Sequence, residues 1–271
     1  MTEHMRVLIT VKAAPEPSKT YIDTVCVAGV RVDQQPFEWI RLYPVPFRHL
    51  DSSAKFAKFQ VIEVDVNRSP KDSRPESRRP VWATLDTVGD ALPLAARAAV
   101  LEPLQDKSMC QLREEVQIDP NAQSLGLVAV RSLERLEFER HPGWTEQQHA
   151  ALDASMQPTL FDEPGAKHPP RLEPPRLRVF YRYRCVDEAC RGHRQSILDF
   201  EMSALQYRNR HASDETLRRS VIQKFQVEKF GPDKRTSLFV GNIADPTKRR
   251  SFSALGVFVV PAHADYGSTL F

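Results

Sequence analysis

The stretch LRVFYRYRC, residues 177–185, decides the fold class of the second half of the chain, because apolar and charged side chains alternate along it. Side chains of a β-strand point alternately to its two faces, so the pattern predicts a half-buried strand. One face would carry Arg178, Phe180, Arg182 and Arg184, and the other Val179, Tyr181 and Tyr183. A turn rich in metal-ligating side chains follows directly, at residues 185–193.

Short apolar or alternating runs predict further strands on both sides of this stretch. They are Arg6–Val11, Thr24–Val32, Glu38–Leu42, Phe59–Val66, Leu125–Val130, Arg131–Arg140, Ser196–Phe200, Leu238–Val240 and Leu255–Val260. The second and third of these should pair as a hairpin across a polar turn. Helical patterns occur at Leu85–Leu94, Pro103–Val116, Gln147–Ala154 and Ala204–Phe225. The predicted fold class is α+β, with a β-rich N-terminal part that carries a helical insert and a mixed α/β C-terminal part.

Prolines mark the expected boundaries, since the 271 residues include 21 Pro and 10 Gly. Proline breaks helices and cannot donate to a strand ladder, which argues against a long helical bundle or a solenoid. Residues 157–176 hold six prolines and are interpreted as a linker. We therefore expect an N-terminal domain at residues 1–156, the linker at 157–176 and a C-terminal domain at 177–271, with no internal repeat.

The composition, 41% hydrophobic and 27% charged, is typical of a globular protein and excludes collagen-like, mucin-like and mostly disordered classes. No apolar run reaches the roughly 18 residues of a membrane-spanning helix. The first twelve residues lack the layout of a signal peptide, so a cytoplasmic location is expected. Four cysteines are too few for a disulfide framework.

The net charge of +3 hides an asymmetry between the two parts of the chain. Residues 165–271 carry 19 basic and 11 acidic side chains, a balance of +8, whereas residues 1–164 carry 19 and 24, a balance of −5. A basic C-terminal part favours a polyanionic partner such as a nucleic acid or a nucleotide. The alternative is that arginine is simply abundant throughout.

Cys185, Cys190 and His193 form the sharpest local pattern. Thiolate sulfur and imidazole nitrogen are good zinc ligands, and four ligands make a structural site whereas three plus water make a catalytic one. The fourth ligand could be His211, Cys110, an acidic side chain or water; without a metal role, Cys110 would be a small buried hydrophobe, as would Cys26. We predict a structural zinc site that stabilises a part of the chain with a limited core.

Asp199 and Glu201 follow this turn and would share one face if residues 196–200 form a strand. Two carboxylates beside His193 could hold a divalent ion and position water for phosphodiester hydrolysis. In the alternative interpretation a strand ends here and Asp199 caps the helix that follows. The sequence thus leaves open whether the protein is an enzyme.

Arginines interleave with aromatic residues along residues 178–184, a pattern that suits contacts to phosphates and stacking on bases. The arginines proposed to contact nucleic acid are Arg178, Arg182, Arg184, Arg191, Arg194, Arg208 and Arg210. The alternative is a half-buried strand with a solvated arginine face. A phosphate-contacting surface predicts an affinity that falls steeply with salt.

Two further segments carry weaker functional patterns. The turn from Tyr43 to Arg48, with prolines at 44 and 46, could present a pocket for a nucleotide or another small molecule, or could close the first β core. Residues Gln157, Leu160 and Phe161 lie in a peptide that resembles the one by which many bacterial DNA-processing proteins dock on the sliding clamp. This resemblance implies the clamp as a partner.

The leading hypothesis is a bacterial nucleic-acid-associated binding or accessory protein with a structural zinc site and an arginine-rich surface for phosphates. The competing hypotheses are a metal-dependent phosphodiester hydrolase that uses His193, Asp199 and Glu201, and a domain that senses a nucleotide or small molecule.

Overall fold

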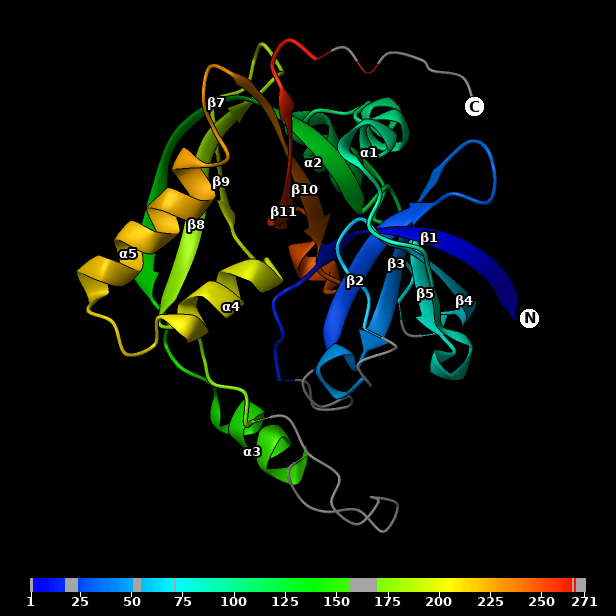
Figure 1. Cartoon of the computed structure of the whole chain (residues 1–271), viewed down its shortest axis with the longest axis horizontal. Coiled ribbons are helices and arrows are strands. Elements are labelled where there is room, and N and C mark those ends of the chain that lie inside the picture. Colours follow the sequence, from blue (N-terminus) through cyan, green and yellow to red (C-terminus); the bar gives the residue numbers. More distant parts are fainter. Residues whose placement is uncertain are drawn as a thin grey trace.

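The computed structural model describes residues 2–17, 24–50, 55–70, 72–155, 170–264 and 266. Figure 1 shows the arrangement of its helices and strands. The strands are β1 (Glu3–Lys12), β2 (Val25–Arg31), β3 (Glu38–Val45), β4 (Val61–Arg68), β5 (Ser77–Pro80), β6 (Asp86–Val88), β7 (Leu125–Arg140), β8 (Leu177–Cys185), β9 (His193–Ser196), β10 (Lys234–Asn242) and β11 (Phe252–Pro261). The helices are α1 (Leu94–Leu101), α2 (Met109–Ile118), α3 (Glu146–Ser155), α4 (Phe200–Arg208) and α5 (Asp214–Ile222). The chain is an α+β protein, as its alternating patterns predicted.

Strands β1 to β5 close into a barrel in the N-terminal part of the chain. The strand order is β1-β2-β3-β5-β4, and β4 pairs back with β1, which completes the ring. Strands β3 and β5 are parallel, and the other neighbours in the ring are antiparallel. Strand β1 is long enough to serve both sides of the ring, since its first half pairs with β4 and its second half with β2.

Strands β7 to β11 form a second ring with the same order of pairing. The sheet runs β11-β10-β7-β8-β9, with antiparallel neighbours throughout. A parallel bridge between Ile197 and Ala254 joins the end of β9 to β11. Strand β7 is shared like β1: residues 125–129 pair with β10, and residues 130–140 pair with β8.

In both rings the first strand pairs with the second and the fourth, and the third lies parallel to the fifth. This is the strand arrangement of the OB-fold, a five-stranded Greek-key barrel. The second ring also has helices α4 and α5 between its third and fourth strands. Because β7 precedes the proline-rich segment and yet belongs to the second ring, the two barrels divide the chain between β6 and β7.

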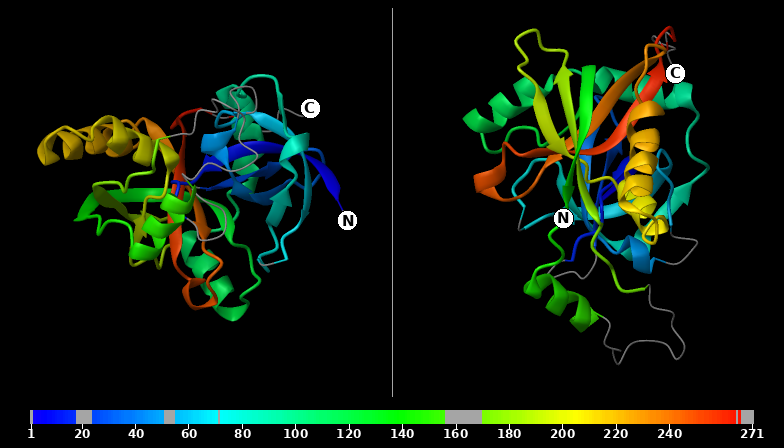
Figure 2. Two further views of the ribbon diagram at one scale, coloured as in Figure 1. Left: turned by 90° about the horizontal axis from the view of Figure 1, so that it is seen from below. Right: turned by 90° about the vertical axis from the view of Figure 1, so that its left-hand side faces the viewer.

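Three apolar clusters hold the fold together. One fills the first barrel and includes Val7, Ile40 and Val64. A second fills the second barrel, where helices α2, α4 and α5 contribute to it. The third lies between the barrels, which Figure 2 shows side by side, and includes Trp39 and Phe239, whose ring centroids are 6.3 Å apart. The barrels therefore have separate cores and meet through a third apolar cluster between them.

The outer face of β2 and β3 is covered by the second barrel. Ala28, Val30 and Trp39 pack there against residues of β7, β10 and β11. At the edge of this contact Arg41 is 3% exposed and donates from Nη2 to the backbone oxygen of Ser124, at 3.2 Å. This face of the first barrel is closed to large ligands.

The structure corrects three of the predicted elements. Residues 85–94 do not form a helix, because Gly89 (φ +60°) and Pro93 interrupt them, and β6 lies there instead. The strand expected at residues 196–200 ends at Ser196, and Asp199 caps α4. The helix expected over residues 204–225 is divided into α4 and α5, since Ser213 caps a new helix.

The hairpin of β2 and β3 is confirmed, and α3 lies where residues 147–154 predicted a helical turn. No helix in the described part of the chain is long and apolar enough to cross a membrane.

Candidate metal centre and arginine face

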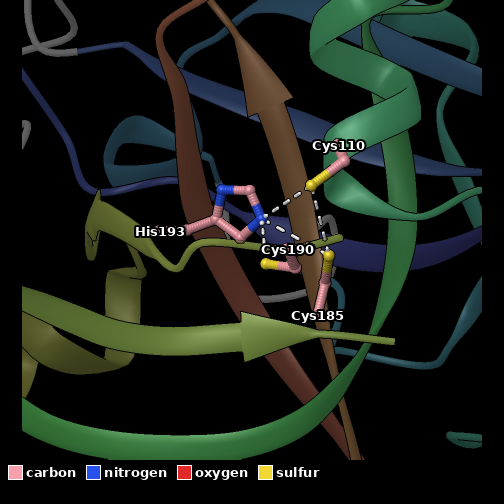
Figure 3. A group of neighbouring side chains, drawn as sticks. All are labelled: Cys110, Cys185, Cys190 and His193. Carbon is pink, nitrogen blue, oxygen red and sulfur yellow. Dashed lines mark hydrogen bonds between the residues drawn. The ribbon is translucent and has the colours of Figure 1, made fainter. Parts of the chain in front are cut away.

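Cys110, Cys185, Cys190 and His193 meet at one point (Figure 3). Their ligand atoms all lie within 4.8 Å of one another. The Cys110 Sγ to Cys185 Sγ distance is 3.8 Å, far longer than a disulfide bond, and the four cysteines of the chain are free thiols. From Nε2 of His193 the distances are 3.2 Å to Cys190 Sγ, 3.4 Å to Cys185 Sγ and 3.6 Å to Cys110 Sγ. This group could hold a metal ion.

Four local structures bring these side chains together. Cys185 ends β8, His193 begins β9, and Cys190 lies in the turn between them. In that turn Gly192 has φ +99°, a conformation that favours glycine, and its N–H donates to Cys190 Sγ at 3.4 Å. Cys110 arrives from a distant part of the sequence, on the first turn of α2.

Helix α2 is fixed at this end by its own cap and by the turn. Ser108 forms a capping box with Gln111, which satisfies the first backbone N–H groups of the helix. The Ser108 hydroxyl also donates to Asp187 in the cysteine turn, at 3.3 Å. Cys110 is therefore held toward the other three side chains by contacts that do not depend on a metal.

The protonation states of the cluster suit cation binding. Burial, together with the neighbouring Cys185, raises the pKa of Cys110 to about 12, because several thiolates cannot be packed together without a cation. Burial, assisted by the charge of Arg113, lowers the pKa of His193 to about 4. The imidazole is thus neutral at pH 7 and its nitrogen is free to ligate.

A layer of buried polar contacts supports the cluster. The Tyr183 ring packs on the His193 ring, with centroids 5.2 Å apart. The Tyr183 hydroxyl donates to Gln195 Oε1 at 2.7 Å, and Gln195 Nε2 donates to the sulfur of Met109 at 2.9 Å. These contacts tie β8 and β9 to α2 around the imidazole.

The structure does not assemble the residues of the hydrolase hypothesis. His193 faces the three cysteines, whereas Asp199 accepts the Glu201 N–H at 2.8 Å as the N-cap of α4. Asp199 and Glu201 belong to no group of three described His, Cys, Asp or Glu side chains whose ligand atoms lie within 4.8 Å. The predicted shared strand face does not exist, because both carboxylates lie at the start of a helix.

The arginines of β8 and β9 line the outer face of the second barrel, together with glutamates of β7. We call this set the arginine face: Arg135, Arg178, Arg182, Arg184, Arg194, Glu134, Glu137 and Glu139. Glu137 lies at its centre, 2.7 Å from Arg194 and 3.1 Å from Arg182. Five arginines face three glutamates, so the face retains a balance of +2 and its guanidinium groups are held in place.

The aromatic side chains of this strand are buried. Tyr181 and Tyr183 are 0% exposed and belong to the core, so they cannot stack on bases. Phe180 points to the arginine face but is covered by Arg194, whose guanidinium lies 3.5 Å from the ring centroid. The planar group that this face presents is therefore a guanidinium that is stacked on a ring.

The other predicted arginines lie elsewhere. Arg191 is exposed in the cysteine turn, and Arg208 ends α4. Arg210 follows that helix, with its guanidinium 4.4 Å from the Tyr207 ring centroid. His211, a candidate fourth ligand, is exposed and is not part of the metal cluster.

Two sequence segments have different outcomes. In the turn from Tyr43 to Arg48, Phe47 is buried in the first barrel and packs against Phe56 and Phe200, so it closes a core. The clamp-like peptide with Gln157, Leu160 and Phe161 lies outside the described residues.

Sequence reasoning named Cys110 only as one of several possible fourth ligands, because 75 residues separate it from Cys185. It missed the glutamates of the arginine face altogether. Their alternation within residues 131–140 was the available signal, since a neighbouring arginine strand invites opposite charges.

Comparisons with known proteins match the whole length of the chain. The model of a family described as a domain of unknown function, DUF8757, matches residues 105–270, and that of a second, DUF8758, matches residues 3–103. No curated protein matches the chain. A solved structure described as a murine DNA-binding protein bound to double-stranded DNA is 11% identical, covers 97% of this chain and 98% of its own, and has a TM-score of 0.34. A score this low does not establish a shared fold.

Proposed function

The chain belongs to the family described as a domain of unknown function, DUF8757, whose model spans the second barrel. From the geometry of the arginine face and the cysteine–histidine cluster we propose that the second barrel binds single-stranded nucleic acid on that face and is stabilised by a structural zinc ion. The location of the arginine face on the outside of β7, β8 and β9 carries the proposal.

Zinc fits the distances within the cysteine–histidine cluster. Zinc bonds of about 2.3 Å to sulfur and about 2.0 Å to nitrogen, arranged as a tetrahedron, separate two sulfurs by about 3.8 Å and a sulfur from a nitrogen by about 3.5 Å. The measured separations are 3.8 Å between two sulfurs and 3.2 to 3.6 Å from sulfur to nitrogen. Three thiolates and one imidazole fill a tetrahedral site, which leaves no ligand position for water.

A structural zinc ion would join α2 to the hairpin of β8 and β9 and so contribute directly to stability. Three thiols that bind zinc must stay reduced, so we propose that the protein works in a reducing compartment such as the cytoplasm. We expect about one zinc per chain in the purified protein, measured by elemental analysis, and its loss in Cys185→Ser. Cys26→Ser is the matched control, because Cys26 lies outside the cluster. Full zinc retention in Cys185→Ser would contradict the assignment.

The topology supports nucleic acid as the ligand of the arginine face. OB-folds bind oligonucleotides on the face of their second and third strands and on adjoining loops. In the first barrel this face is buried against the second, whereas in the second barrel it consists of β8 and β9 and carries Arg178, Arg184 and Arg194. The location of the binding face is inferred by analogy with other OB-folds, and the charge and exposure of the arginines support it.

Single-stranded nucleic acid suits the chemistry of the face. Arg178 and Arg184 are about half exposed, at 50% and 49%, and can reach phosphates. Arg194, stacked on Phe180, presents a flat cation on which a base can stack. The glutamates hold the guanidinium groups apart. When a nucleic-acid strand binds, its phosphates would replace the glutamate carboxylates as partners of the arginines.

The test is fluorescence anisotropy with a labelled oligo(dT) of about 16 nucleotides, titrated at several salt concentrations. We expect log K to fall linearly with log salt, with a slope of about −0.7 for each phosphate contact. Arg178→Ala/Arg184→Ala should make the slope shallower by about 1.4 and weaken binding. Arg6→Ala is the matched control, because Arg6 is a cross-strand, ion-paired arginine on the first barrel, 47% exposed. Absent binding, or equal effects of both variants, would refute the proposal.

A further inference from the structure

A polar cavity of about 450 Å³ lies between the first barrel and α4. Its lining includes four cationic side chains from separate parts of the chain and two carboxylates. They are Lys12, Lys58, Arg208, Lys224, Asp199 and Glu201. Neither the arginine face nor the metal cluster contributes to it.

The two lysines are held in place by backbone oxygens. Lys12 Nζ donates to the oxygen of Phe56 at 3.2 Å and lies 4.4 Å from the Phe47 ring centroid. Lys58 Nζ donates to the oxygen of Val257 at 3.2 Å. An ammonium group has three N–H donors, so each retains donors for a ligand. Glu201 and Asp199 lie close enough to both ammonium groups to raise their pKa values, against the larger effect of burial.

The surroundings make these charges costly without a ligand. Burial lowers the pKa of Lys58, and burial also lowers that of Lys12, which is further lowered by the charge of Lys58. Two partly buried ammonium groups that line one cavity form a site for a multiply charged anion, which would offset both charges. Arg208 and Lys224 add positive charge, although Lys224 is already paired with Glu228 at 3.4 Å.

The carboxylates add selectivity. Asp199 is 7% exposed and uses Oδ1 to cap α4. Burial raises its pKa to about 6, so near neutral pH it exchanges between a hydrogen-bond acceptor and a donor. A ligand that carries hydroxyl or amino groups next to its anionic group would pair with Asp199 and Glu201. An anion without such groups would leave both carboxylates without hydrogen-bond partners and close to its own negative charge.

From these contacts we propose that the cavity binds a phosphate monoester of mononucleotide size. Lys12 and Lys58 would hold the phosphate, and Asp199 and Glu201 would hold hydroxyl or amino groups of the remainder. The cavity volume suits a small-molecule site, and cavities at the junction of two structural units are frequent places for such sites. The phosphate could belong to a free mononucleotide or to the 5′ end of a strand.

The test is calorimetric titration of the full-length protein with adenosine 5′-monophosphate, adenosine and inorganic phosphate. We expect the nucleotide to bind and adenosine not to bind. Lys12→Met and Lys58→Met, which keep an apolar stem, should weaken binding by about tenfold or more. Lys55→Met is the matched control, because Lys55 is exposed nearby and does not line the cavity. Circular dichroism and the melting temperature check that the variants remain folded.

Two further arms separate the outcomes. A 5′-phosphorylated dinucleotide that binds more tightly than its 5′-hydroxyl form identifies a strand end, and binding of neither dinucleotide identifies the free nucleotide as the ligand. Arg178→Ala/Arg184→Ala should leave nucleotide binding unchanged, which separates this site from the arginine face. Absence of nucleotide binding, or equal affinity in Lys55→Met, Lys12→Met and Lys58→Met, overturns the proposal.

Discussion

Asp199 combines two requirements that rarely meet in one side chain. Its position directly before α4 calls for an oxygen that accepts a backbone N–H, which it supplies to Glu201. Its burial makes the charged form expensive, the charge of Lys58 offsets this only in part, and the pKa rises to about 6. An asparagine would also accept the backbone N–H and would bury no charge. The carboxylate therefore costs stability at this position.

We predict that Asp199→Asn stabilises the protein above pH 6 and not at pH 4. The folded-state pKa, about 6, lies above the ordinary value of 3.8, so the stability associated with the protonated carboxyl is present below pH 3.8 and is lost as pH rises to 6. Asparagine caps helices as well as aspartate does and has no charge to bury. The gain at pH 8 should approach about 3 kcal/mol, measured by urea unfolding at several pH values. A gain that does not change with pH would contradict this account.

A second prediction concerns Glu137, the carboxylate at the centre of the arginine face. The hydrogen bond from Arg194 lowers its pKa, so it is charged at neutral pH and competes with phosphates for the arginines. Glu137→Gln should tighten oligo(dT) binding and steepen the salt dependence by up to about 0.7 for each additional phosphate that the arginines then bind. Glu63→Gln is the control, since Glu63 pairs with Arg6 on the first barrel. Weaker binding by Glu137→Gln would show that the glutamate orders the arginines more than it competes.

At the scale of elements, α2 links the two barrels and also belongs to the metal cluster. Met109, Leu112 and Val116 bury one of its faces in the second barrel. Cys110, on its first turn, reaches the ends of β8 and β9. The helix is ten residues long and is marginal on its own, so these attachments determine whether it stays folded.

We predict that Cys110→Ser releases the N-terminal turn of α2. Without one thiolate the zinc affinity falls, and the ion no longer joins the helix to the hairpin. Hydrogen exchange followed by mass spectrometry should show faster exchange at residues 107–118 and 185–195, with little change in β1 to β4. Cys26→Ser should match the wild type. Unchanged exchange in Cys110→Ser would mean that the apolar contacts alone hold the helix.

Local patterns in the sequence predicted most strands, because alternation along residues 59–66 and 177–185 reports one buried face. They did not predict the ring closures, since these join residues far apart, such as Ile197 with Ala254. The internal repeat was missed because the two barrels share an order of pairing and not a sequence of residues. The helix expected at residues 85–94 does not form. The apolar spacing there suggested a helix, but Gly89 and Pro93 interrupt the segment.

The cysteine–histidine cluster shows the same limit of sequence patterns, which do not reveal residues that only folding brings together. The turn containing Cys185 and His193 was recognised from spacing, which local geometry fixes. The fourth ligand comes from a separate helix, and only the packed fold selects Cys110 over His211. Similarly, the positive charge of the arginine strand was visible, whereas the glutamates that moderate it became evident only once β7 paired with β8.

At the scale of the whole molecule, the two barrels are joined by a buried polar contact as well as by apolar packing. Glu76 accepts the N–H and the hydroxyl of Ser124, at 2.6 and 2.8 Å, and Arg41 donates to the same serine. The contact therefore places a buried anion and a buried cation on either side of one residue of the second barrel. It fixes how the barrels meet.

We predict that Arg41→Met destabilises the protein by about 1 to 3 kcal/mol, because Arg41 is buried and its loss removes the donor to the hydroxyl and backbone oxygens of Ser124. Both barrels should unfold together at a lower urea concentration, since an apolar cluster joins them. Tryptophan fluorescence reports on Trp39 between the barrels, Trp82 beside the first core and Trp144 before α3, and circular dichroism follows the whole chain. Arg6→Met, on an exposed pair, should cost less than about 1 kcal/mol. Two separate transitions would show that the barrels fold independently.

The face that joins the barrels also orders events during synthesis. The strands of the first barrel are complete once β5 has been made, but Phe239, which packs on Trp39, lies on β10 and is translated only after β7, β8 and β9. Strand β7 likewise waits for β10, because Ala129 pairs with Ser237. The nascent chain thus passes through a stage with a closed first barrel, an uncovered apolar face and an unpaired strand edge, which favours chaperone binding and makes slow translation of the segment from β8 to β11 a hazard for aggregation.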